Sequence, residues 1–130
     1  MSYNISYRDK LLKLKSILAT EKYTREDSDI EYAINNFQNI RFVSYIMDNY
    51  GPESSKMLFQ IIDFKEYKKN SKIFKVGEQS TYCYIVLLGE VAVLSYVKDA
   101  NEYSGHENII LSTLKVGDLF GDSTKVKQLR

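Results

Sequence analysis

The spacing of apolar residues changes at Phe64, and this change constrains the fold more than any other feature of the chain. Before Phe64, apolar residues recur at helical spacing in stretches that begin near residues 5, 28, 40 and 52. After Phe64, β-branched and aromatic residues alternate, and turn residues interrupt them about every ten residues. The pattern predicts an α+β chain, mainly β, in which helices precede the short antiparallel strands of a sandwich or barrel.

The expected helices have recognisable ends. Residues 5–20 place leucine and isoleucine on one face and lysine on the others, which predicts a basic amphipathic helix packed on its own domain. Thr24 or Ser28 is expected to cap the second helix. Gly51 and Pro52 separate the third helix from the fourth, because proline fits the first helical turn.

Glycines mark the expected corners of the β region. Gly77, Gly89, Gly117 and Gly121 each stand where an apolar run must reverse. Glycine enters the left-handed backbone region without a steric penalty from Cβ. Strands are expected around Tyr67 and Ile73 and at residues 84–88, 91–97 and 109–114. Four tyrosines are interpreted as cross-strand packing residues: Tyr82, Tyr84, Tyr96 and Tyr103.

Composition excludes several function classes. With 18 basic and 17 acidic residues the net charge is +1, so no overall field attracts nucleic acid or an anionic membrane. The apolar runs are too short to cross a bilayer, and the first residues lack a signal core. The single cysteine, Cys83, is expected as a buried, inert thiol in a reducing compartment. One histidine and one cysteine are too few ligands for a typical zinc site.

Two ordered motifs carry a resemblance to a known family. Residues 77–96, GEQSTYCYIVLLGEVAVLSY, contain a Gly-Glu turn followed by tyrosine and isoleucine and then by Gly-x-Val. Residues 111–122, LSTLKVGDLFGD, contain Leu-x-x-Gly-x-x-Phe-Gly-Asp. Together the two segments resemble the cyclic-nucleotide-binding domain family, and the helices before them resemble its helical lead-in. The resemblance covers about residues 28–130.

The resemblance implies a specific architecture, an incomplete antiparallel β-roll, or jelly-roll-like barrel, of the cyclic-nucleotide-binding type. Residues 1–27 are then an N-terminal amphipathic arm, and residues 28–130 are the domain, with a helical lead-in at 28–63 and the roll at 64–130. The family's last strands and its C-terminal capping helix have no counterpart. A protein partner is therefore expected to cover the open barrel edge, and tight nucleotide binding is not expected.

The resemblance also implies a ligand site for cAMP or cGMP, without a cofactor or metal. In the family, backbone N–H groups and one arginine hold the cyclic phosphate, and a glutamate accepts from the ribose 2′-hydroxyl. Gly121 matches the cassette glycine, and Asp122, one methylene shorter, matches the glutamate. Ser123 and Thr124 bring hydroxyls where the family has small apolar residues. Arg130 matches the phosphate arginine, with a spacing one residue short of the common pattern.

No enzymatic activity is expected, because the chain lacks a nucleophile motif. His106 is interpreted as a surface turn residue, and the acids beside the glycine turns, Glu78, Glu90 and Asp118, as solvated. The lysines within residues 68–72 are interpreted as a solvated hairpin tip rather than a nucleic-acid contact.

Two functions remain open at this point. In the first, the chain is a regulatory domain that senses cAMP or cGMP. In the second, it is a non-enzymatic structural or assembly protein that uses a degenerate nucleotide-binding fold as a protein-interaction module. Either would act in the cytoplasm, or in a ciliary or cytoskeletal assembly, without nucleic-acid binding or membrane insertion.

Overall fold

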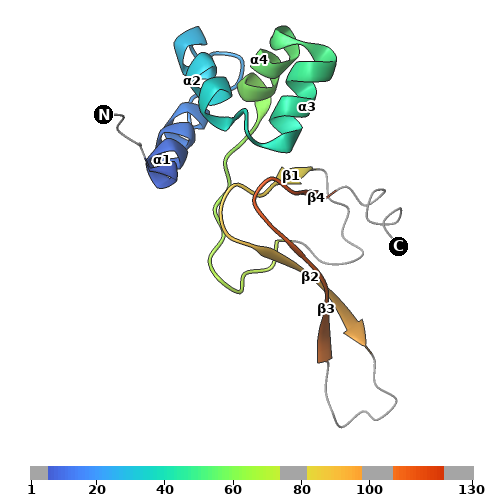
Figure 1. The fold of residues 1–130 in the computed structure, drawn as a ribbon. Coiled ribbons are helices and arrows are strands. Elements are labelled where there is room, and N and C mark those ends of the chain that lie inside the picture. The colour runs from blue at the N-terminus through green and yellow to red at the C-terminus, as the bar shows by residue number, and fades with distance from the viewer. Residues whose placement is uncertain (1–5, 74–81, 98–106, 122–130) are drawn as a thin grey trace. The chain divides into compact units, whose positions relative to one another are not determined.

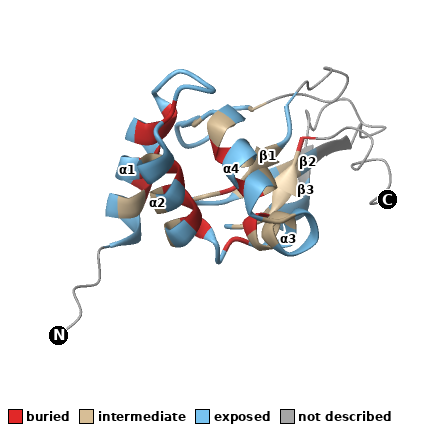
Figure 2. Cartoon of the chain, turned by 90° about the horizontal axis from the view of Figure 1, so that it is seen from above, coloured by how far each residue is buried: buried red, intermediate tan, exposed pale blue. Residues whose placement is uncertain are grey.

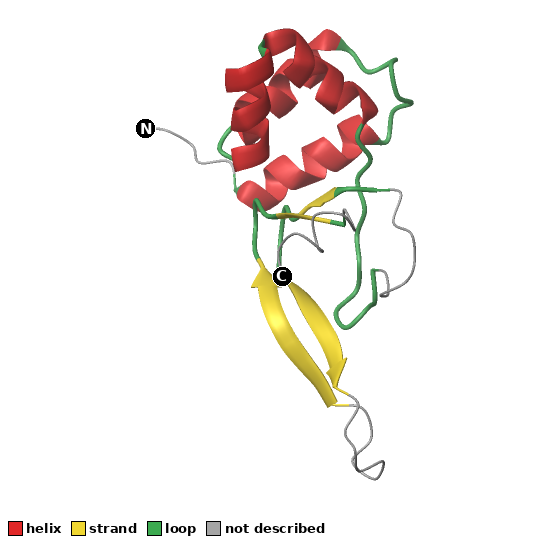
Figure 3. Cartoon of the chain, turned by 90° about the vertical axis from the view of Figure 1, so that its right-hand side faces the viewer, coloured by secondary structure: helices red, strands yellow, loops and turns green. Residues whose placement is uncertain are grey.

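The chain has a mixed α+β fold divided into two compact units, Met1–Gly77 and Glu78–Arg130 (Figure 1). The computed structural model describes residues 6–73, 82–97 and 107–121. In this part of the chain, four helices precede two small two-stranded antiparallel sheets. Figure 3 shows the helices in red and the strands in yellow. The predicted order of helices followed by strands is confirmed, and the described residues form no closed barrel.

The first unit is built from four helices around one apolar core. They are α1 (Tyr7–Leu18), α2 (Asp27–Phe37), α3 (Arg41–Tyr50) and α4 (Pro52–Ile61). The core residues of this unit are Leu11, Leu14, Ile17, Leu18, Ile30, Ala33, Ile34, Phe37, Ile40, Val43 and Phe59. Figure 2 shows them in red along the inner sides of the helices. None of the helices in the described ranges is long and apolar enough to cross a membrane.

Local chemistry explains most of the helix ends. The Ser6 hydroxyl accepts a hydrogen bond from the Asp9 N–H at 3.1 Å and so caps α1. Gly51 separates α3 from α4 with a φ of +88°, and Pro52 occupies the first turn of α4. The prediction of a break at these two residues is confirmed.

The predicted caps of α2 are wrong. Glu26 occupies the N-cap position, and its side chain makes no capping hydrogen bond. The Thr24 hydroxyl instead donates to the carbonyl oxygen of Glu21 at 2.7 Å, which uses it within the preceding turn. Ser28 lies one residue inside the helix, past the position from which a side chain caps it.

The second unit contains two antiparallel ladders. Strand β1 (Tyr84–Ile85) pairs with β4 (Leu119–Phe120), and β2 (Val91–Val97) pairs with β3 (Glu107–Leu114). The β2–β3 register shifts by one residue after Val93, because Val93 lies opposite Ser112 and Leu94 lies opposite Ile110. Leu111 is therefore the extra residue of a β-bulge, a feature that bends and twists a hairpin.

The strand predicted around Tyr67 does not form, since residues 62–73 contain neither helix nor strand, whereas the strand predicted around Ile73 extends beyond the described residues. Every residue from 65 to 72 is exposed, so this stretch has no buried face to pair against the core. A turn is present at the predicted break: the Ser71 N–H donates to the Lys68 carbonyl at 3.0 Å, and Asn70 has a φ of +67°. The lysines there are exposed, but they do not form the tip of a β-hairpin.

Candidate functional site

The two segments that carry the sequence motifs meet in the β1–β4 ladder. Tyr84 lies opposite Phe120, and Ile85 lies opposite Leu119. The rings of Tyr84 and Phe120 stack with centroids 4.9 Å apart and an interplanar angle of 15°. The interpretation of Tyr84 as a cross-strand packing residue is thus confirmed. The side chains of Tyr96 and Tyr103 lie outside the described residues.

A tight turn at Lys115–Asp118 directly precedes β4. The Asp118 N–H donates to the Lys115 carbonyl at 2.9 Å, and an Asp118 carboxylate oxygen accepts from the Lys115 N–H at 2.7 Å. Val86 extends the ladder, since its N–H donates to the Asp118 carbonyl at 3.0 Å and its carbonyl accepts from Gly117 at 2.8 Å. The half-buried Asp118 therefore holds a turn and is not simply a solvated acid; Glu90 is exposed, as expected.

Gly121, which follows β4, occupies a position that only glycine fits. Gly121 is buried, and its backbone φ is +103°. A Cβ atom here would lie 2.7 Å from the Tyr82 carbonyl oxygen and 2.7 Å from Cδ2 of Tyr84. The corner predicted at Gly121 is confirmed, as are the positive φ values of Gly89 (+82°) and Gly117 (+95°). Gly77 lies outside the described residues.

Of the five residues predicted to bind a ligand, the structure places only Gly121. Asp122, Ser123, Thr124 and Arg130 lie outside the described residues, so their positions relative to Gly121 are not part of the geometry. The structure describes the chain only up to the glycine corner directly before Asp122. The β1–β4 ladder and the turn at Lys115 precede this corner and hold it in place.

Comparison of the chain with protein-family models, with curated proteins and with solved structures finds no match. The resemblance to the cyclic-nucleotide-binding domains therefore depends on the two sequence motifs alone.

The described ranges contain no cluster of metal-binding side chains, and their single cysteine is not buried. Cys83 is exposed, so the prediction of a buried thiol is wrong. The reason is that β1 begins only at Tyr84 and is two residues long, which leaves Cys83 in the preceding loop. No group of three His, Cys, Asp or Glu side chains in this part of the chain could hold a metal ion. Glu78 and His106 lie outside it.

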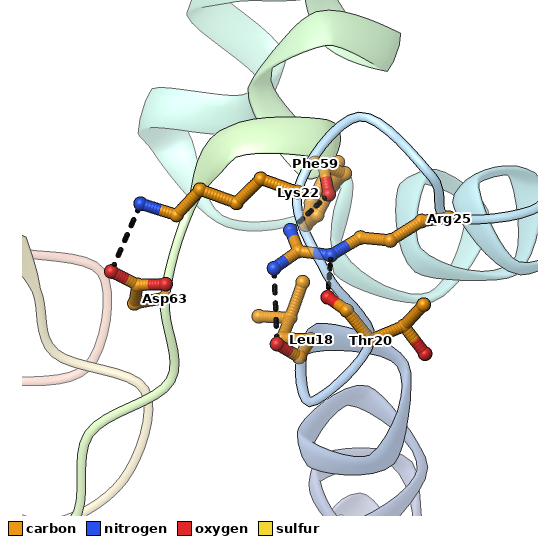
Figure 4. Close-up of polar contacts among 6 residues, drawn as sticks. All are labelled: Leu18, Thr20, Lys22, Arg25, Phe59 and Asp63. Atoms are coloured by element: carbon orange, nitrogen blue, oxygen red, sulfur yellow. Dashed lines mark hydrogen bonds and ion pairs between the residues drawn. The ribbon is translucent and has the colours of Figure 1, made fainter.

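Sequence reasoning missed a polar cluster around Arg25 in the helical unit. Arg25 is only 4% exposed. Its guanidinium donates to three carbonyl oxygens, from Nε to Thr20 at 3.0 Å, from Nη1 to Phe59 at 2.8 Å and from Nη2 to Leu18 at 3.0 Å. Figure 4 shows the guanidinium between these carbonyls. In addition, the amide side chain of Gln60 bonds both the N–H and the carbonyl of Arg25.

The electrostatics of this cluster suit a permanent cation. Two of the acceptors, the carbonyls of Leu18 and Phe59, lie at the C-terminal ends of α1 and α4, where helix carbonyls lack intrahelical donors and carry partial negative charge; the third, that of Thr20, lies just after α1. Burial lowers the pKa of Arg25, and the nearby Asp63 carboxylate opposes that shift. Asp63 also forms an ion pair with Lys22 at 3.1 Å.

Arg25 is therefore a structural clamp between α1, α4 and the loop that joins α1 to α2, not a ligand or proton-transfer group. A guanidinium keeps its proton at all physiological pH values, and its three nitrogens already have acceptors. Nothing in the local sequence, Thr-Arg-Glu-Asp, distinguishes this arginine from a solvated one. Its role follows only from the convergence of two helix ends.

Proposed function

We propose that this chain is a cyclic-nucleotide-binding-like regulatory domain that senses cAMP or cGMP through residues 121–130. The observation that carries the proposal is the pairing of the two motif segments in β1 and β4, with Gly121 locked at the corner beside Tyr84. The paired residues Tyr84 and Phe120 lie 36 positions apart in sequence, and their pairing adjoins the point where the phosphate-binding cassette would begin. The second unit is then part of an antiparallel β-roll.

In this proposal the residues after Gly121 supply the chemistry of the site. Their backbone N–H groups donate to the cyclic phosphate, an anion that unpaired amide groups hold well. Arg130 adds two charge-assisted hydrogen bonds from a planar fork. Asp122 accepts from the ribose 2′-hydroxyl, and the hydroxyls of Ser123 and Thr124 are further donors to the phosphate oxygens.

The proposed domain is residues 28–130, with residues 1–27 as a helical arm. This division stays a prediction: α1 belongs with α2, α3 and α4 to one compact unit, in which the Arg25 clamp ties α1 to α4. A regulatory domain that binds its ligand without turning it over needs no catalytic group. Its place would be the cytoplasm, where cyclic nucleotides are produced and degraded.

Isothermal titration calorimetry with cAMP and cGMP, and with 5′-AMP and 5′-GMP as controls, tests the proposal. We expect binding of one cyclic nucleotide and at least about a tenfold loss in Arg130→Ala, because a hydrogen bond to a charged group contributes about 1.5–3 kcal/mol. Arg8→Ala removes an equal charge from the exposed surface of α1 and should leave binding unchanged.

The substitution Asp122→Glu tests the proposal by a gain of affinity. The added methylene restores the reach of the family's glutamate, so affinity for the cyclic nucleotide should rise, while affinity for a 2′-deoxy analogue should stay the same. Absence of binding by the folded chain at millimolar ligand, or equal binding of 5′-AMP, contradicts the proposal.

A second candidate function is supported by the exposed apolar side chains of the β2–β3 hairpin. Leu94 and Ile110, which lie opposite each other, are 43% and 62% exposed, and the bulge residue Leu111 is 64% exposed. An assembly protein that uses the fold as an interaction module would cover such a face with a protein partner. This function predicts that the chain binds neither nucleotide. It also predicts that the chain associates with a protein partner, as measured by sedimentation, and that Ile110→Asp abolishes this association.

A further inference from the structure

The segment that follows α4 is a lysine-rich, solvent-exposed run. Residues 65–72, KEYKKNSK, hold four lysines and one glutamate, a net charge of +3, and all eight residues are exposed. Glu66 already forms an ion pair with Lys15 of α1. The remaining positive charge is therefore concentrated around the turn at Lys68–Ser71.

Ser71 lies at the end of this turn and is exposed. Lys68 and Lys69 precede it by three and two residues. The turn is closed by the bond from the Ser71 N–H to the Lys68 carbonyl, and residues 62–73 contain neither helix nor strand. Opening one exposed turn hydrogen bond costs only about 1 kcal/mol, so the segment can adopt the conformation that an enzyme groove requires.

Three other serines follow a basic residue by three positions but lie within helices. Ser28, three residues after Arg25, lies in the first turn of α2, directly after Glu26 and Asp27. Ser16, three residues after Lys13, lies inside α1. Ser44, three residues after Arg41, lies in α3 and is half-buried, and its hydroxyl donates to the Gln38 carbonyl. Presenting Ser16 or Ser44 to an enzyme requires local unfolding of a packed helix. Among the described serines and threonines, Ser71 alone has basic residues both two and three positions before it and is also exposed in an irregular backbone.

We propose that Ser71 is a phosphorylation site for a protein kinase that selects basic substrates and uses ATP. Protein kinases read charge patterns, and lysines two and three residues before the acceptor fit an acidic peptide groove. The Ser71 Oγ forms a bond to the γ-phosphorus of ATP while the bond from that phosphorus to the β,γ-bridging oxygen breaks. ADP leaves, and the hydroxyl proton passes to the catalytic aspartate of the kinase.

The modification would change the electrostatics of the segment between α4 and the second unit. A phosphoserine brings a charge of about −1.5 to −2 and three strong acceptor oxygens. The net charge of residues 65–72 falls from +3 to about +1, and the new phosphate has lysines on both sides with which to pair. This site does not depend on nucleotide binding.

The test is phosphorylation of the full chain by a purified kinase that prefers basic substrates, with an acidophilic kinase as negative control and mass spectrometry to locate the phosphate. We expect one phosphoryl group on Ser71 and none in Ser71→Ala, while Ser16→Ala and Ser44→Ala are modified like the wild type. The paired variant Lys68→Gln, Lys69→Gln should lower kcat/KM roughly tenfold.

Lys65→Gln, Lys72→Gln is the matched control, because it removes the same charge from the same segment at the wrong positions. It should reduce kcat/KM much less. Undiminished incorporation in Ser71→Ala, phosphate on Ser16 or Ser44, equal losses in the two lysine pairs, or no incorporation at all would each overturn the proposal.

Discussion

Gly121 packs so closely against Tyr84 that a Cβ atom on the glycine would lie 2.7 Å from Cδ2 of the tyrosine ring. The same ring stacks on Phe120, so the last residue of β4 and the glycine after it both contact one side chain of β1. The corner that leads into the proposed cassette is thus fixed by side-chain packing as well as by two strand pairs.

Gly121→Ala should destabilise the second unit by about 3 kcal/mol, because it combines an unfavourable left-handed backbone with a steric overlap. Gly89→Ala is the matched control. Gly89 also has a positive φ, but nothing lies within 4 Å of its Cβ position, so only the backbone cost of about 1 kcal/mol applies. Hydrogen exchange of the Val86 amide, which bonds Asp118, reports this stability. Equal effects in both variants would contradict the tight contact.

Arg25→Met should destabilise the helical unit by about 3 kcal/mol or more, because it leaves three carbonyl oxygens without their donor. Arg25→Lys should recover only part of the loss, since a single ammonium group does not match the planar fork. Urea unfolding followed by circular dichroism measures both.

Lys22→Ala serves as the control for the Arg25 variants. It breaks the ion pair with Asp63, in which both side chains are more than 40% exposed, and should change stability by less than about 1 kcal/mol. A loss as large as that of Arg25→Met would show that charge near Asp63, and not the clamp of the helix ends, stabilises the unit.

Tyr23→Asn should stabilise the helical unit by about 0.5–1 kcal/mol. Tyr23 has a left-handed φ of +67° and is 70% exposed, so the protein bears the backbone cost without gaining buried area. Asparagine adopts this conformation more readily. Tyr67→Asn, at an exposed tyrosine without a positive φ, should have little effect on the urea midpoint. Equal midpoints for Tyr23→Asn and the wild type would show that the strain is absent.

Tyr7 should make stability fall at alkaline pH. Burial raises the pKa of its phenol, and the ring packs edge-on against Phe37 with centroids 6.1 Å apart. Because the folded state favours the neutral phenol, its contribution is complete below the unfolded pKa of about 10 and is lost as pH rises through the folded value. Unfolding in urea should therefore show a larger alkaline loss in the wild type than in Tyr7→Phe; equal losses would contradict the shift.

The parts of the fold that the sequence predicts well are those set by short-range chemistry. Helical spacing of apolar residues places four helices, Gly51 and Pro52 place a helix boundary, and the glycine corners at Gly89, Gly117 and Gly121 follow from a backbone region that other residues avoid.

The parts that the sequence does not predict depend on long-range contacts. The alternation of apolar and polar residues predicts a strand near Tyr67, but the residues there are exposed and have no buried face that would stabilise a strand. Cys83 follows the apolar pattern of its neighbours yet lies outside a very short strand. The Arg25 clamp needs the ends of two helices to converge, and no local pattern encodes that geometry.

Nucleotide binding at the Gly121 corner is tested most directly by two-dimensional NMR of the ¹⁵N-labelled chain titrated with cAMP and with cGMP. One of the two should shift the Gly121 amide resonance in a saturable way, while the Gly89 amide stays in place and Arg130→Ala suppresses the shift. A Gly121 resonance that neither ligand moves at millimolar concentration in the folded protein, or that inorganic phosphate moves equally, contradicts a cyclic-nucleotide site.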